Sequence, residues 1–386
     1  MTTLVLNAGS STLKASLIEP GTDAPRASVT ETWAVTGAGR QDVEGTFERV
    51  LDGVGGETAA VGGVGHRVVH GGDSFRAPVV IDDATVAAID RLGPLAPLHN
   101  PIAISTIRVA TSRLPDVSHV ACFDTAFHAN LPETAWRYPA PDSWLDWGIR
   151  RYGFHGLSVE WSVGRAAALL DRPIGRVRLV VAHLGAGCSV TAVDRGRSVW
   201  TSMGLTPLEG TMMATRAGSI DPGALIRLLR DGRLTVEELD DALERRSGLL
   251  AIGGTADMRS LLDREAAGDD RATLAVAMFV DRAAAAIGSA MTRLASLDAL
   301  VLTGGIGENA AAIRSRICQR LGIAGVPRVA ARKITRDAVV SAGDQRPAVL
   351  RIAAREDVVI ARAVERLASA RAGDPAVRAR RTRAAR

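Results

Sequence analysis

The sequence predicts an α/β protein built from two copies of one fold. Two turns of small residues, each between short apolar strands, lie about half of the 386-residue chain apart. They read LVLNAGSSTLKASL over residues 4–17 and LVVAHLGAGCSVTAV over residues 179–193. An apolar run enters each turn and an alternating run leaves it, which is typical of an antiparallel hairpin. Because the pattern recurs in both halves of the chain, we interpret it as a duplication.

The two turns are suited to holding a polyphosphate from both sides. Small residues allow backbone N–H groups to surround an anion, and hydroxyl groups add donors. Lys14 follows the first turn, and only Lys14 and Lys333 are lysines among the 47 basic residues. A lysine offers a phosphate a compact point charge, whereas an arginine offers a planar fork. An ordinary surface lysine is the alternative interpretation of Lys14.

Length and composition indicate a globular enzyme of two domains. A chain of 386 residues exceeds the usual size of one domain, and its 47% hydrophobic and 23% charged residues are ordinary for such an enzyme. The three cysteines form no close pair, so neither a disulfide framework nor a thiolate metal site is indicated. No signal peptide is visible, and charged residues interrupt the apolar stretch near 272–301. We therefore expect a cytoplasmic protein without a membrane span.

The end of the chain carries the basic net charge. Residues 371–386 hold six arginines against one aspartate, which equals the net charge of +5 of the whole chain. Since this Ala/Arg-rich segment has little to bury, we predict that it is a disordered tail. Nonspecific contact with nucleic acid is the less favoured alternative.

The order of elements predicts a first domain at residues 1–128. After the hairpin comes a Gly-rich segment that reads VGGVGHRVVHGG over residues 61–72. We expect next a helix near 83–92, a Pro-rich turn at 94–101, a helix at 101–113 and a buried strand at 117–123. A last helix at 357–370 is expected to pack back on this domain and complete it.

Residues 129–356 are expected to form the second domain. Apolar periodicity predicts helices at 157–171, 222–231 and 235–246, and a long Ala-rich amphipathic helix at 271–296. The second hairpin follows the first of these helices. A strand at 298–303, a Gly-rich segment at 304–309 and a helix from about 309 come later.

Aromatic residues gather at the start of this second part. Nine of the 14 aromatic residues lie between Phe123 and Trp161, in a Pro-containing stretch with little periodicity. A mobile linker would not concentrate bulky rings. The stretch therefore predicts a packed interdomain junction or a subunit interface.

The segment from Gly304 to Asn309 is a candidate nucleotide site. It lies between a predicted strand and a predicted helix, where glycines let a base or phosphate approach and a helix N-terminus favours anions. It also matches a loose dinucleotide pattern, but the acid that this pattern expects about 20 residues later is missing. A nicotinamide enzyme is therefore disfavoured. No Walker sequence and no protein-kinase signature set occurs in the chain.

Four further residues have settings that suit phosphoryl transfer. Arg67 and Arg216 lie among glycines and small residues, and two such arginines suit an anionic substrate and a transferring phosphoryl group. Glycines near His155 expose its ring at a turn, and Asp124 ends the buried strand, a usual place for a catalytic carboxylate. Each residue alone also fits a structural ion pair, a packing histidine or a helix cap. Their combination is what indicates chemistry.

Five separated blocks carry a resemblance over most of the chain. They read NAGSSTLK at 7–14, HRVVHGG at 66–72, FDTAFH at 123–128, RYGFHG at 151–156 and TGGIGEN at 303–309. In this order they resemble the blocks of the acetokinase family, which belongs to the actin/hexokinase/Hsp70-like ATPases. The resemblance runs from Leu4 to about Arg362. It implies two duplicated ribonuclease-H-like, actin-like ATPase domains with a nucleotide cleft between them.

The resemblance also implies an activity and a set of site residues. The activity is reversible phosphoryl transfer between ATP and acetate with Mg²⁺, or Mn²⁺ in its place, by a homodimer with no membrane and no specific nucleic-acid partner. The implied catalytic residues are Asp124, His155 and Arg216. Acetate would meet Arg67, Val69, Leu98 and Pro207, and the metal would lie near Asn7 and Glu356. The nucleotide would contact Lys14, His183, Leu184, Gly185, Ala186, Gly187, Asp257, Met258, Arg259, Gly305, Ile306, Gly307, Glu308 and Asn309.

The implied acceptor affects the expected role of Asp124. A carboxylic acid has a pKa near about 4–5, as Asp and Glu side chains have, so acetate is already an ionised nucleophile at neutral pH. No general base is then needed. We expect Asp124 to position Mg²⁺ or the reacting groups rather than to remove a proton.

The chain departs from the family pattern at several positions near the site. Ala186 stands where the family usually has Asn, and Ala217-Gly218-Ser219 stands for Ser-Gly-Asp. Arg355 and Asp357 stand where Asn and Glu are usual. These differences concern nucleotide affinity and metal geometry.

Three rival functions remain at this stage. A propionate kinase is the nearest rival, because one methylene in an acyl pocket is worth only about 1–3 kcal/mol. A sugar kinase of the same fold would need a base for a neutral hydroxyl. A nucleotide-switched binding protein would have no use for two arginines and a histidine around a small apolar pocket.

Overall fold

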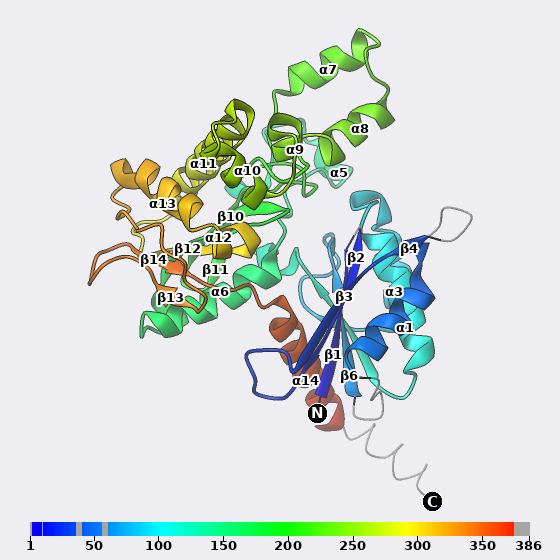
Figure 1. Cartoon of the computed structure of the whole chain (residues 1–386). Helices are drawn as coiled ribbons and strands as arrows, with labels where there is room; N and C mark the ends of the chain where they lie inside the picture. The colour runs from blue at the N-terminus through cyan, green and yellow to red at the C-terminus, as the bar shows by residue number, and fades with distance from the viewer. Residues whose placement is uncertain (1, 10, 36–40, 56–60, 374–386) are drawn as a thin grey trace, which may run out of the picture. The chain divides into compact units, whose positions relative to one another are not determined.

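The computed structural model describes residues 2–9, 11–35, 41–55 and 61–373, which fall into two compact units (Figure 1). Unit 1 comprises Met1–Ala129 and Arg355–Arg386, and unit 2 comprises Asn130–Ala354. Glu356 therefore belongs to unit 1, whereas the sequence places it at the end of the second part. Residues 374–386 of the predicted tail lie outside the described residues.

Unit 1 is built on a six-stranded sheet with the order β3-β2-β1-β6-β8-β7. Its strands are β1 (Thr2–Ala8), β2 (Thr12–Ile18), β3 (Ala27–Thr32), β6 (Val61–Val68), β7 (Val79–Val80) and β8 (Ser118–Phe123), and β4 (Ala34–Val35) pairs separately with β5 (Gln41–Asp42). The central strands β1, β6 and β8 are parallel, and the outer strands are antiparallel to their neighbours. The predicted first hairpin is the β1–β2 pair.

Helices cover both faces of this sheet. They are α1 (Val43–Gly53), α2 (Asp83–Asp90), α3 (Asn100–Arg113) and α14 (Glu356–Gly373), with 3₁₀ turns at Gly93–Leu95 and Ala126–His128. On one face, Leu4 and Leu13 pack with Phe47 of α1 in a core that reaches α3. Alternate residues of a strand point to opposite faces. Ser16 accordingly faces the other way, and its hydroxyl donates to Asp357 of α14.

The last helix of the chain packs on the sheet of unit 1. Helix α14 contacts β1, β2, β6 and β8. A Cβ at Gly65 of β6 would lie only 2.2 Å from Cγ2 of Ile360 in α14. Glycine is therefore required at this position for the close approach of the helix to the strand.

Unit 2 repeats the sheet of unit 1 in order and direction. Its sheet has the order β11-β10-β9-β12-β14-β13. The strands are β9 (Arg178–Leu184), β10 (Cys188–Asp194), β11 (Arg197–Thr201), β12 (Ala299–Thr303), β13 (Ala338–Val339) and β14 (Ala348–Arg351). Strands β9, β12 and β14 are parallel and the others antiparallel, as in unit 1. The predicted second hairpin and the predicted duplicated α/β fold are confirmed.

The helices of unit 2 mostly follow the sequence prediction. They are α4 (Glu133–Trp136), α5 (Ser143–Asp146), α6 (Gly156–Leu169), α7 (Pro222–Arg230), α8 (Val236–Arg245), α9 (Gly248–Gly253), α10 (Met258–Ala266), α11 (Asp270–Met291), α12 (Gly304–Asn309) and α13 (Ala311–Arg320), with 3₁₀ turns at Ile174–Arg176 and Leu321–Ala324. Two predictions are wrong in detail. Helix α11 ends at Met291 and not near 296, because the chain must turn to enter β12 at Ala299. A helix begins already at Gly304 and not near 309, because the segment Gly304–Asn309 is itself a short helix.

Helix α11 is a core helix of unit 2. By length and composition alone it could cross a membrane. It contacts α9, α10, α13 and the strands β9 and β10, and it buries a face that includes Val276, Phe279 and Ile287. Its apolar character is explained by this packing.

Candidate active site

In unit 1, three predicted site residues meet at the carboxyl ends of neighbouring parallel strands. Asn7 lies near the end of β1, Arg67 near the end of β6, and Asp124 directly after β8. Nε of Arg67 donates to Oδ1 of Asp124 at 2.9 Å and Nη2 donates to Oδ2 at 2.5 Å. Nη1 of Arg67 donates to Oδ1 of Asn7 at 3.0 Å. Ligand sites in α/β sheets commonly lie at this edge.

Glu356, the first residue of α14, completes this cluster. Its Oε2 lies 3.7 Å from Nε of Arg67. Burial alone would lower the pKa of Arg67, but the carboxylates of Asp124 and Glu356 raise it above its ordinary value. Arg67 is therefore a fixed cation. Its five N–H groups make three of these bonds, so each terminal nitrogen keeps one N–H for a ligand.

The carboxylates of the cluster outnumber its cations. Burial raises the pKa of Glu356. The charge of Arg67 opposes this shift, as does that of Lys14, whereas Asp124 and Asp357 add to it. Three carboxylates thus share two cations. Such a site gains from a further positive charge.

Lys14 lies opposite Asn7 in the β1–β2 register. Its Nζ donates to Oδ2 of Asp357 at 3.2 Å, and the same oxygen accepts from Oγ of Ser16 at 3.2 Å. Asp357 is buried, whereas the Lys14 side chain is 42% exposed. The ammonium group is thus held at one point by Asp357 and remains open to solvent.

In unit 2, His155 and His183 stack with ring centroids 4.2 Å apart. Nδ1 of His155 lies 3.0 Å from Oγ of Ser189, and Nδ1 of His183 lies 2.8 Å from Oγ of Ser158. His155 has a φ of 59°, in the left-handed region that few residues other than glycine adopt. Backbone strain of this kind gathers at functional sites. The two serines were not predicted, although Ser189 pairs with His183 in the β9–β10 register.

Arg216 lies in the same unit and is held at two nitrogens. Its Nε forms an ion pair with Oε2 of Glu244 at 2.9 Å, and its Nη1 donates to the carbonyl oxygen of Pro207 at 3.3 Å. The side chain is 18% exposed. The structure thus brings together two predicted residues, Arg216 and Pro207. Val69 and Leu98 belong to unit 1, and a methyl pocket formed with Pro207 stays a prediction.

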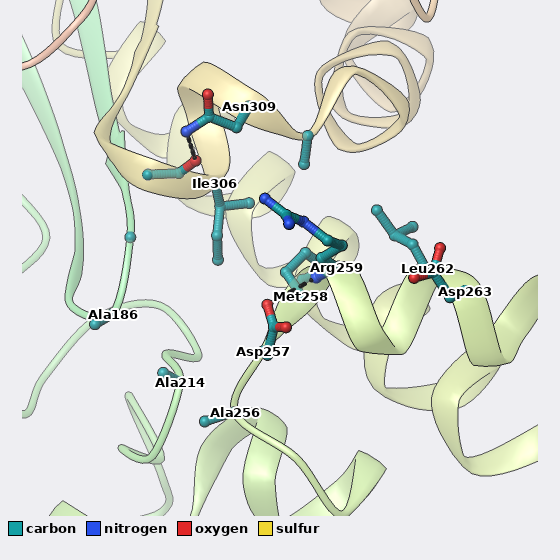
Figure 2. Close-up of a pocket in the computed structure, with 13 residues that line it drawn as sticks. Ala186, Ala214, Ala256, Asp257, Met258, Arg259, Leu262, Asp263, Ile306 and Asn309 are labelled. Carbon is teal, nitrogen blue, oxygen red and sulfur yellow. Dashed lines mark hydrogen bonds between the residues drawn. The ribbon is translucent and has the colours of Figure 1, made fainter.

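Unit 2 also contains a cavity of about 540 Å³, drawn in Figure 2. It is lined by Gly185, Ala186, Ala214, Ala256, Asp257, Met258, Arg259, Leu262, Asp263, Gly305, Ile306, Asn309 and Ala310. Figure 2 shows the side chains of Ile306 in α12 and Arg259 in α10 pointing toward each other. Ala186, Ala214 and Ala256 lie toward the left of this view. The volume is in the range of small-molecule and cofactor sites.

The sequence and the fold of this chain agree with one family. A profile of the acetokinase family matches residues 36–362. A protein named acetate kinase from Gloeobacter violaceus is 41% identical over 397 residues, which cover 94% of this chain and 98% of that protein. The chain belongs to the acetokinase family. An acetate kinase from Deinococcus deserti is 42% identical over 97% of this chain and 100% of its own.

Solved structures of a propionate kinase and of an acetate kinase have the same fold as this chain. A propionate kinase from Francisella tularensis superposes with a TM-score of 0.85 at 35% identity, covering 94% of this chain and 98% of its own. An acetate kinase from Porphyromonas gingivalis superposes with a TM-score of 0.83 at 30% identity and the same coverage. This chain therefore has the fold of these two kinases.

The cavity includes only part of the nucleotide set that the acetokinase resemblance implies. It is lined by Gly185, Ala186, Asp257, Met258, Arg259, Gly305, Ile306 and Asn309 of that set, and not by Lys14, His183, Leu184, Gly187, Gly307 or Glu308. Leu184 is buried under Gly304, where a Cβ would lie 2.8 Å from the Leu184 carbonyl oxygen. The Glu308 carboxylate accepts from the backbone N–H of Ala354 at 2.8 Å, within unit 2. Contacts of these residues with nucleotide stay predictions.

Sequence reasoning missed five residues of the cavity wall. They are Ala214, Ala256, Leu262, Asp263 and Ala310. Helix periodicity could have identified two of them, because Leu262 and Asp263 lie one turn beyond Met258 and Arg259 on α10. Ala214 comes from a distant loop and left no local signal.

Proposed function

We propose that the protein reversibly transfers the γ-phosphoryl group of ATP to acetate, giving acetyl phosphate and ADP. The observation that carries this proposal is the state of Asp124, whose two carboxylate oxygens both accept from Arg67. An alcohol acceptor, such as a sugar, needs a base to take its proton. An acid with a pKa of about 4–5 is already ionised at neutral pH. Because both oxygens of Asp124 already accept from Arg67, the site favours a carboxylate acceptor.

We propose that the cavity of unit 2 takes the adenosine part of ATP. The Arg259 guanidinium and the Ile306 side chain suit the two flat faces of a purine base, because a guanidinium plane stacks on aromatic rings. The Asp257 carboxylate suits a ribose hydroxyl. Gly185 and Gly305 follow β9 and β12, where backbone N–H groups can meet phosphates. ATP as co-substrate fits a cytoplasmic location.

Phosphoryl transfer requires mainly that the reacting groups are positioned and that negative charge is neutralised. A phosphoryl group in transfer carries negative charge on its outer oxygens, and it is stabilised by fixed cations and donors. The free N–H groups of Arg67 suit the acetate carboxylate. Nη2 of Arg216 suits the transferring group, and the hydroxyls of Ser189 and Ser158 hold the rings of the two stacked histidines in place.

The residues of unit 1 fit a magnesium ion. The surplus of carboxylate over cationic side chains leaves the cluster short of positive charge, and Asn7 and Glu356 offer the oxygen donors that Mg²⁺ prefers. Among the described residues, no group of three or more acidic, histidine or cysteine side chains forms a ready metal cage. This agrees with an ion held by one or two side chains together with substrate phosphates. When bound, it would neutralise phosphate charge.

We also propose a homodimer, in line with the family resemblance. Trp147 is 69% exposed and Trp144 is 42% exposed, although both belong to the aromatic-rich segment. None of the residues of α7 is buried, and Ile226 on this helix is 52% exposed. Such an apolar surface is typical of a subunit interface. Light scattering is expected to show a dimer for the parent protein and a monomer for Ile226→Glu, and a monomeric parent protein would contradict the proposal.

A hydroxylamine trap tests the proposed function. Purified protein with ATP and Mg²⁺ is given acetate, propionate, butyrate or glucose at equal concentration, and acyl hydroxamate and ADP are measured. We expect hydroxamate from acetate, less from propionate, and no glucose-dependent ADP. A higher kcat/KM for propionate would make the protein a propionate kinase. Absence of hydroxamate with every acid would reject the proposal.

A further inference from the structure

We propose that Glu244, near the end of α8, is a positioning residue that holds Arg216 for phosphoryl transfer. This inference rests on the proposed function, because it needs Arg216 to act on the transferring group. No motif in the sequence marks Glu244. It enters only through the contacts around Arg216.

The first observation is how the guanidinium group is held. Glu244 fixes Nε of Arg216 and the carbonyl oxygen of Pro207 fixes Nη1. Nη2 has no hydrogen-bond partner within the described part of the chain. Because Nε and Nη1 are anchored, the guanidinium plane is oriented and Nη2 is available to a ligand. Without Glu244, the carbonyl of Pro207 would be the remaining oxygen anchor.

The second observation is that the end of α8 also binds the backbone around Arg216. Oγ1 of Thr215 donates to the carbonyl oxygen of Glu244 at 2.9 Å, and the N–H of Ala217 donates to the carbonyl of Leu243 at 3.2 Å. Thr215 and Ala217, the chain neighbours of Arg216, are thus hydrogen-bonded to the backbone of Glu244 and Leu243. The helix end acts as a support for this loop.

The third observation is that Glu244 is placed against the ordinary preferences of a helix. An acid in the last turn of a helix faces the negative end of the helix dipole. Glu244 is only 12% exposed, burial raises its pKa, and the charge of Asp240 adds to this shift. Opposing it are the charge of Arg216 and, more weakly, that of Arg245. A residue that breaks local rules in this way is often kept for function.

The contact itself is an ion pair rather than a complete hydrogen bond. Oε2 of Glu244 lies 2.9 Å from Nε of Arg216, yet it is buried without a well-aligned donor. A buried carboxylate oxygen in this condition is costly unless the cation stays beside it. The pair therefore keeps the Arg216 guanidinium beside Glu244.

A double-mutant cycle tests this proposal. Glu244→Gln keeps the size of the side chain and removes its charge. We expect kcat for acetyl phosphate formation to fall by about 10-fold to 10²-fold with little change in the KM for ATP, as when a residue that orients a functional group is lost. Arg216→Ala alone is expected to lower kcat by about 10²-fold to 10³-fold or more. In the Arg216→Ala background, Glu244→Gln should cause no further loss, because it acts only through Arg216.

The matched control is Asp241→Asn, one turn earlier on the same helix. Asp241 pairs with the exposed Arg245 and Arg246, so this variant removes an acid from α8 without reaching Arg216. We expect its kcat to equal that of the parent protein. Glu244→Asp, which keeps the charge, should retain more activity than Glu244→Gln, and it serves as the test variant if Glu244→Gln does not fold.

The outcomes separate this proposal from the proposed function. If the parent protein makes no acyl phosphate, the proposed function fails. If the parent protein is active and Glu244→Gln is equally active, the positioning role is wrong. The role is also wrong if the losses from Glu244→Gln and Arg216→Ala multiply in the double variant, because Glu244 would then act independently of Arg216.

Discussion

The Arg67–Asp124 pair offers the sharpest test of how unit 1 builds its part of the site. Asp124 is 1% exposed and Arg67 is 15% exposed, and two donors of Arg67 meet the two oxygens of Asp124. Asp124→Asn replaces one of these acceptors by an amide NH₂, which cannot accept. It also removes the charge that holds the guanidinium in place.

The size of the effect follows from what remains around Arg67. Removing one partner of a buried ion pair costs about 3–5 kcal/mol, because the other charge stays buried. Glu356 at 3.7 Å and Asn7 at 3.0 Å still face Arg67, so we expect a loss near the lower end of this range. For a unit of this size, each kcal/mol lowers the melting temperature by about 2–4 °C. The expected decrease is therefore roughly 6–12 °C.

Thermal and urea unfolding followed by circular dichroism measure this loss, and the hydroxamate assay measures activity. We expect kcat to fall by about 10²-fold or more, because Arg67 would turn toward Glu356. Glu44→Gln is the control, since Glu44 pairs with Arg113 on the surface of the same unit and should change stability by less than about 1 kcal/mol. An Asp124→Asn protein with the melting temperature and kcat of the parent would refute the reasoning.

Three further predictions concern other parts of the chain. His66 and His119 form a buried pair, with Nε2 of His66 3.0 Å from Nδ1 of His119, and burial lowers the pKa of both below the ordinary 6.5. The unfolded chain therefore binds more protons than the folded one, and the free energy of unfolding should fall as pH drops below about 6.5. Equal urea midpoints at about pH 8 and about pH 5.5 would contradict this. Ala186→Asn adds a donor to the cavity wall and should lower the KM for ATP by about 3-fold to 10-fold, the worth of one hydrogen bond; an unchanged KM would count against the assigned cavity. Gly304→Ala places a Cβ 2.8 Å from the Leu184 carbonyl oxygen, at a residue with a φ of +77°. Kinetics should therefore show a higher KM for ATP, and calorimetry should show a loss of about 1–2 kcal/mol or more in the free energy of unfolding. A variant with parent kinetics would be inconsistent with this packing.

Local patterns in the sequence were sufficient for the two hairpins and for most helices. The alternating strands around each small-residue turn have one stable arrangement, because a shift of one residue would expose the buried face. The end of α11 was not predictable, since its apolar pattern continues past Met291 into the connection before β12. In this connection the chain must turn to enter β12, and this requirement outweighs the helix propensity of its residues.

The sequence singles out candidate site residues but not the contacts between them. Arg67 and Asp124 were both singled out, yet they are 57 residues apart and only the β6–β8 register shows that they pair. No pattern in the sequence distinguishes Glu244 from the other acids of α8. Glu308 lies in a motif that predicts nucleotide contact, but the motif does not show that its carboxylate accepts from the backbone N–H of Ala354. Long-range pairing of this kind has no signature in a local pattern.

The most direct measurement of the central claim is ³¹P NMR of the purified protein with ATP, Mg²⁺ and acetate. The account predicts that the γ-phosphate signal of ATP is replaced by the signal of an acyl phosphate, with one ADP formed for each, and that added ADP reverses the change. Conversion of the γ-phosphate only to inorganic phosphate, or no conversion at all, would contradict it.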